Sequence, residues 1–217
     1  MNLVIIFGAI LDNRSNLNNN FADLDNDLRK ASVIKERVSL ISSHMYKQFL
    51  DHQNATENTK EMFYNIWKES ESVINSLKES FSSRSIPSEH IFAELEAERT
   101  AFVMNILWHT ITFKMRGNYK PQALQREIDA PLFSGRIIAL SGNFNNKKIQ
   151  ETDYPEILEA EIASLYIPAD KNKSCIIKIK HLGNREFPIN HTDAPREFIL
   201  KVIEIICGGG IYHEELF

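Results

Sequence analysis

The sequence predicts an α+β protein that is mainly α, with an N-terminal antiparallel bundle of long helices followed by a small α+β part with a short sheet. Two observations lead to this fold class. Before residue 117, apolar residues recur at spacings of three and four, the periodicity of helices that bury one face. After residue 133, short runs rich in β-branched residues end at glycine- and asparagine-containing turns, which is typical of strands.

The first two helices of the expected bundle precede residue 82. One covers about residues 21–53 and the next about residues 59–81, with polar turn-formers at 54–58 between them. Long helices joined by short connections favour an antiparallel bundle. Ahead of them, residues 1–20 are interpreted as a short buried apolar segment followed by a flexible, asparagine-rich loop. The apolar start is too short to span a bilayer and lacks the basic residues of a signal peptide.

The third expected helix, from Ser85 to Gly117, carries the strongest helical signal in the chain. Glutamates crowd its first half, Lys114 and Arg116 lie near its end, and a glycine follows them. This order of charges complements the helix dipole, and glycine is a common residue just after a helix. The second half is apolar over most of its circumference, which places this helix in the middle of the bundle, the expected domain 21–117.

One narrow polar stripe is expected on the third helix. The candidate catalytic residues of this helix are His109, Asn105, Glu98, Arg99 and Arg116. All but Arg99 project within roughly 60° of one another on a helical wheel. The stripe is either the one solvent-exposed edge of the helix or a functional groove. The groove is considered because perturbed ionisable groups tend to cluster at functional sites.

Within this stripe, residues 104–109 (MNILWH) resemble the motif of the HEPN ribonucleases, a family of helical bundles. That motif has an arginine, then a polar residue that is often asparagine, and a histidine four to six residues after the arginine on the same helix. Asn105 and His109 match it, but Met104 stands at the arginine position, so the chain is not assigned to the family. The resemblance implies a metal-independent ribonuclease in which His109 transfers protons and Arg99 or Arg116 stabilises the phosphate.

Composition limits the function classes. The chain has 217 residues, 43% of them hydrophobic, and a formal net charge of −4, so nothing global points to nucleic acid or anionic membranes. Its two cysteines, Cys175 and Cys207, give neither a disulfide framework nor a zinc-ligand spacing, and they fit the reducing cytoplasm. His90, Glu94 and Glu98 are spaced four apart, but no Glu-x-x-His pair accompanies them. We therefore expect no metal and no cofactor.

The C-terminal part is expected to begin with a linker, residues 118–133, and to continue as a small α+β domain, residues 134–217. Its expected strands lie at about residues 136–141, 165–168, 175–181 and 185–189, the last two forming a hairpin. Its expected helices lie at about residues 122–128, after Asp153, and at 194–207, where Asp193 is the cap and a triple glycine the stop.

Two pairs of residues in this domain are candidate binding residues. His191 and Asp193 stand between a strand and a helix, where loops often carry functional groups. Lys178 and Lys180 belong to a basic stretch that suits RNA or a phosphate. The alternative for the lysines is a solvated sheet face in which they protect an edge.

Two functions remain open from the sequence. The first is a soluble cytoplasmic interaction or regulatory protein without a catalytic motif, which binds a protein partner or a second copy through its apolar helix faces. The alternative is the HEPN-like ribonuclease, with RNA as its partner and Asn105 and His109 in its site. Neither function requires a membrane span, and none is expected.

Overall fold

The computed structural model describes residues 3–119, 133–144, 159–183 and 185–208, with the backbone alone at 3–28, 118, 119 and 181. Its main feature is a seven-stranded antiparallel sheet in which each strand pairs with the next one along the chain. The strands are β1 (Ile91–Leu95), β2 (Ala101–Ile106), β3 (His109–Tyr119), β4 (Ser134–Ser141), β5 (Glu161–Pro168), β6 (Cys175–Ile179) and β7 (Arg185–Ile189). The helices are α1 (Leu3–Ser82), α3 (Ala194–Cys207) and the short 3-10 helix η3 (Lys180–Leu182).

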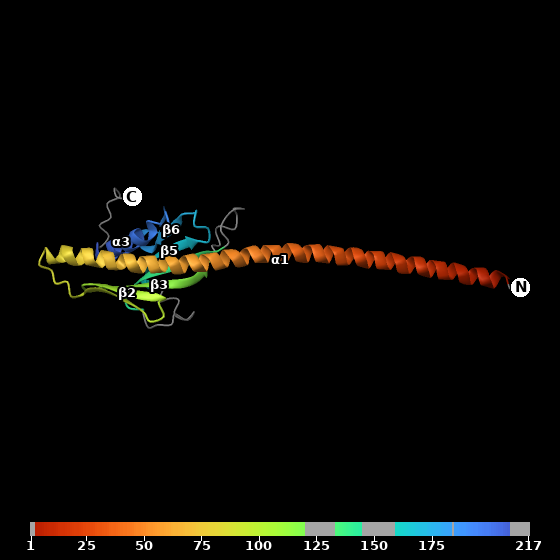
Figure 1. Ribbon diagram of the computed structural model, residues 1–217, viewed down its shortest axis with the longest axis horizontal. Helices are drawn as coiled ribbons and strands as arrows, with labels where there is room; N and C mark the ends of the chain where they lie inside the picture. Colours follow the sequence, from red (N-terminus) through yellow and green to blue (C-terminus); the bar gives the residue numbers. More distant parts are fainter. Residues whose placement is uncertain (1–2, 120–132, 145–158, 184, 209–217) are drawn as a thin grey trace. The chain divides into compact units, whose positions relative to one another are not determined.

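By its internal contacts the chain divides into two units, residues 1–49 and residues 50–217. The first unit holds the N-terminal part of α1. The second holds the rest of α1, the whole sheet and α3, and Figure 1 shows this part of α1 alongside the sheet with α3 in blue nearby. No helix within the described ranges combines the length and the apolar character that crossing a membrane requires.

The prediction of an antiparallel bundle of helices is wrong. Where the structure describes the chain, it has one long and one short α-helix, and strands are prominent. Residues 85–117, expected as the central helix, hold β1, β2 and most of β3. From Thr110 to Arg116, polar and apolar residues alternate strictly, which is the period of two that a strand requires. The residues expected on one helical stripe are therefore distributed over two hairpins.

The long helix α1 also runs through the break expected at residues 54–58. Thr56 and Thr59 donate side-chain hydrogen bonds to the carbonyls one turn earlier, at 2.8 and 2.5 Å. The amide of Asn58 donates to two carbonyls at the end of β5, each at 3.0 Å. These polar groups are satisfied inside a helix, so the first two expected helices are one. Residues 12–20, expected as a loop, also lie within the bounds of α1.

The core lies between one face of the sheet and the two helices of the second unit. Phe102 of β2 stacks on Phe113 of β3, with ring centroids 4.7 Å apart. Phe63 and Trp67 of α1 contact Phe102 at 5.6 and 5.3 Å. Phe198 of α3 meets Phe113 edge-on at 5.8 Å. Both helices therefore bury their apolar sides against the same face of the sheet.

The helix and strands predicted for the C-terminal part agree more closely with the structure. The final helix has the expected bounds, 194–207, and Asp193 is at its N-cap, although its side chain makes no capping hydrogen bond. The expected strands correspond to β4, β6, β7 and the second half of β5. Strands on both sides of the expected linker pair in one sheet. The expected helix at 122–128 and most of the one after residue 153 lie outside the described residues.

Candidate functional site

Asn105 and His109, the pair behind the ribonuclease interpretation, lie on either side of the two-residue turn that joins β2 to β3. In the sheet register Asn105 pairs with Thr110 and Ile106 pairs with His109. Since successive residues of a strand point to opposite faces, the side chains of Asn105 and His109 lie on opposite faces of the sheet. Asn105 accepts a hydrogen bond from the Thr110 hydroxyl at 2.8 Å. The helix on which the HEPN resemblance depends is absent from this stretch.

The other three candidate catalytic residues lie elsewhere. Glu98 and Arg99 are in the turn between β1 and β2, and both are exposed. Arg116 is on β3, directly opposite Arg136 of β4. The structure therefore divides the five candidates among three places. In the described ranges, no group of three or more histidine, cysteine or acidic side chains is arranged to hold a metal ion.

Glu98 and Arg99 border a cleft of about 530 Å³ between α1 and the β1–β2 turn, which we call the α1–β1 cleft. Its volume is in the range of small-molecule sites. Its apolar lining comes from three elements: Phe63, Tyr64 and Trp67 of α1, Leu95 of β1 and Met115 of β3. Its polar rim consists of Lys60, Glu98, Arg99 and Thr100. Two candidate residues from the sequence are thus placed beside an aromatic surface.

The turn that carries Arg99 is held by hydrogen bonds at both ends. The amide of Arg99 donates to the carbonyl of Glu96 at 2.9 Å, and the amide of Met115 donates to the carbonyl of Thr100 at 2.9 Å. The hydroxyl of Thr100 also donates to the Glu96 carboxylate at 3.2 Å. Arg99 has φ of 54°, in the left-handed region that residues with a Cβ rarely adopt.

His191 and Asp193 border a second cleft, of about 440 Å³, between α1 and the start of α3. Arg196 of α3 contacts Glu69 of α1 across it, with Nε to Oε1 at 2.6 Å. The structure therefore places two of the four candidate binding residues at the border of one cleft.

His191 is half-buried, and its Nε2 has no hydrogen-bond partner among the described residues. Burial lowers the pKa of His191, and the nearby Lys171 lowers it further, while Glu61 and Asp170 act in the opposite direction. Neutral imidazole is therefore favoured at this position near pH 7.

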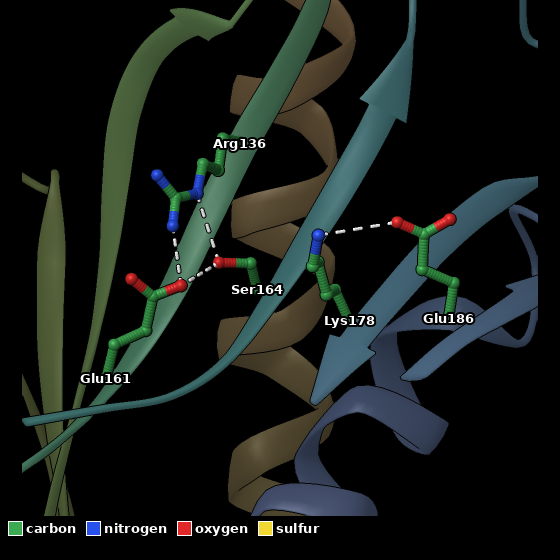
Figure 2. Close-up of polar contacts among 5 residues, drawn as sticks. All are labelled: Arg136, Glu161, Ser164, Lys178 and Glu186. Carbon is green, nitrogen blue, oxygen red and sulfur yellow. Dashed lines mark hydrogen bonds and ion pairs between the residues drawn. The ribbon is translucent and has the colours of Figure 1, made fainter. Parts of the chain in front are cut away.

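Lys178 and Lys180 are not in either cleft. Lys178 of β6 lies opposite Glu186 of β7 in the sheet register, and its Nζ is 3.5 Å from the Glu186 carboxylate (Figure 2). Lys180 is half-buried in η3. An opposite-charge pair across two neighbouring strands is an ordinary stabilising feature of a sheet. The sheet-face interpretation accounts for Lys178 without a ligand.

A polar cluster that was not predicted from the sequence lies on the sheet face away from α1 (Figure 2). Arg136 of β4 contacts the Glu161 carboxylate at 2.5 Å and donates to the Ser164 hydroxyl at 3.0 Å. Ser164 in turn donates to Glu161. The available signal was an arginine at the start of one apolar run and a glutamate at the start of another. Because the three groups satisfy one another, the cluster is best explained as structural.

Most of the large apolar side chains that are exposed in the described chain lie in the first unit. Every residue from 29 to 47 is exposed. The exposed fractions are 61% for Ile34, 57% for Val38, 58% for Ile41 and 62% for Met45. These four residues are separated by four, three and four positions, so they form one row along the helix. We call residues 29–49 the exposed helical segment and these four residues its apolar row.

Comparison with protein-family models, with curated proteins and with solved structures gives no significant match for this chain.

Proposed function

We propose that this protein is an interaction protein that associates with a second copy of itself through the exposed helical segment. The observation that carries the proposal is the apolar row at Ile34, Val38, Ile41 and Met45. Contiguous exposed apolar surface of this kind marks interaction sites in soluble proteins. Helices draw most of their stability from packing an apolar face, so a partner that covers the row also stabilises the segment.

The spacing of the row suits a coiled coil, in which two positions of each heptad face the partner. The first position is taken by Ala31, Val38 and Met45, and the second by Ile34, Ile41 and Gln48. In an antiparallel pair, first-position residues of one copy meet second-position residues of the other. Val38 then packs against the partner's Ile41, and Ile34 against the partner's Met45. A second copy therefore supplies a matching row without any further sequence requirement.

Charges beside the row favour the antiparallel arrangement. In a parallel pair in register, Lys30 of one copy lies beside Lys35 of the other, and the like charges repel. In the antiparallel pair, Lys35 lies beside the partner's Ser42 instead. The segment as a whole carries five basic side chains and one acidic side chain. Added salt screens the remaining repulsion and is expected to strengthen the association.

The test is sedimentation equilibrium of the full chain. The wild type is expected at twice the chain mass of 25.0 kDa. Replacing Ile34 and Ile41 together by aspartate buries two charges at the contact and is expected to give the monomer mass. The control replaces Ser39 and Ser43 by aspartate, which adds the same charge on the far side of the helix and is expected to leave the association intact.

A wild-type chain that stays monomeric at about 100 µM would remove the proposal, since a specific dimer of even micromolar affinity forms there. Binding that needs another protein and weakens with salt would instead identify an acidic partner for the segment.

The ribonuclease is not proposed, because Asn105 and His109 lie on opposite faces of a hairpin and the motif requires one helix. The cytoplasm remains the proposed compartment, on the grounds that the two cysteines provide no disulfide framework.

A further inference from the structure

We propose that the α1–β1 cleft is a binding site for an organic carboxylate with an apolar tail. The site uses residues of the second unit alone, so it is independent of the association proposed for the exposed helical segment. It consists of an aromatic surface and of cations that make no ion pair with any described residue.

The apolar surface of the cleft is fixed by the core beneath it. Phe63 is buried, and Trp67 is half-buried and packed edge-on against Phe102 with ring centroids 5.3 Å apart. Leu95 and Met115 pack against the same core. These side chains are positioned before any ligand arrives, which lowers the entropic cost of binding an apolar tail.

The rim of the cleft supplies positive charge. Lys60 of α1 and Arg99 of the β1–β2 turn are both exposed, and neither makes an ion pair with any described residue. A guanidinium offers two parallel N–H donors that match the two oxygens of a carboxylate. An apolar tail on the aromatic surface with its carboxylate at the rim therefore satisfies both parts of the cleft.

The backbone at Arg99 adds a second reason to assign the cation a role. Its φ of 54° is costly for a residue with a Cβ, and glycine would adopt it freely. Strained residues of this kind concentrate at binding sites. There the strain is tolerated because the side chain contributes to binding and glycine could not replace it. The hydrogen bonds at both ends of the turn hold this conformation.

Glu98 lies on the same rim and opposes an anion. Its carboxylate is exposed and therefore screened by water, so it weakens the attraction without cancelling it. Removing this charge should strengthen binding of a carboxylate and leave binding of a neutral ligand unchanged. This opposite response of two adjacent residues separates charge recognition from simple apolar adsorption.

The test uses Trp67 as the reporter, in the full chain with Trp108→Phe. Trp108 is the other tryptophan, is 81% exposed at the β2–β3 turn and lies outside the cleft. The emission of Trp67 is followed during titration with octanoate and with 1-octanol, which share a tail and differ in the head group. Octanoate is expected to bind at least about tenfold more tightly, the size of one charge-assisted hydrogen bond.

Three substitutions complete the experiment. Arg99→Gly is expected to weaken octanoate binding by about tenfold, with no loss of folding stability because glycine accepts the positive φ. Glu98→Gln is expected to strengthen it several-fold, and Arg84→Gln, which removes an exposed cation outside the cleft, to change nothing. Equal affinity for the two ligands, an unchanged Arg99→Gly variant, or no response of Trp67 to octanoate at about 10 mM each overturns the proposal.

Discussion

Glu161 shows how one residue depends on its neighbours. Its side chain is 11% exposed and that of its partner Arg136 is 18% exposed, so neither charge is well hydrated. Arg136 also lies directly opposite Arg116 in the sheet register. Like charges in that position destabilise a sheet, and the Glu161 carboxylate offsets them. The acidic residue is therefore required by the two arginines.

Replacing Glu161 by alanine is expected to destabilise the protein by about 3 kcal/mol, because it leaves a poorly hydrated arginine without its counter-charge. Urea unfolding measures the change. The matched control is Glu61→Ala, which breaks the Lys171–Glu61 pair, whose side chains are 56% and 59% exposed. That loss is expected to stay below about 1 kcal/mol. Similar losses in both variants would show that the Arg136 cluster has no special importance.

Residue spacing alone did not locate the pair Asn105 and His109. Four positions apart, they share a face on a helix but not across a two-residue turn, where the register places them on opposite faces. His191 and Asp193 were predicted only to precede the final helix, which forms at 194–207 as the sequence predicts, and the structure places both at the border of a cleft. The position of a polar residue could therefore be predicted only where the neighbouring helix or strand was predicted correctly.

Elements were predictable where local pattern and packing agree. For the amphipathic final helix and the β6–β7 hairpin, the local sequence pattern predicts the structure that the fold contains. The stretch 85–117 forms strands although its apolar residues are numerous enough to satisfy helical spacing, and the alternation from Thr110 to Arg116 is the local signal for a strand. In α1, the polar residues at 54–58 suggested a break, since partners from β5 are not visible in the sequence.

The contact between α1 and β4 depends on Gly135. A Cβ at this position would overlap the Thr59 side chain and lie 3.0 Å from the Ala55 carbonyl oxygen. Gly135→Ala is therefore expected to cost about 1–3 kcal/mol of unfolding free energy, as in other overpacked cores. Gly117→Ala is the control, because its Cβ would meet nothing within 4 Å. Thermal unfolding of the two variants compares them, and a Gly135→Ala protein as stable as the control would disprove the close packing.

At the scale of the whole molecule, the two units differ in the packing that stabilises their folded structure. The second unit has a continuous core formed by the sheet and two helices. In the first unit, the described side chains from 29 to 47 are all exposed, and an isolated helix gains little stability without a packed face. The proposed association supplies the missing packing to the first unit and requires nothing from the sheet.

The most direct measurement is amide hydrogen exchange of the intact protein at two concentrations, read by mass spectrometry. Association through the apolar row predicts that amides of residues 29–49 exchange slowly at about 100 µM and rapidly at about 0.1 µM, by mass action. Amides of β2 to β6 should exchange equally slowly at both concentrations and serve as the internal control. Rapid exchange of residues 29–49 at both concentrations would contradict self-association through the exposed helical segment.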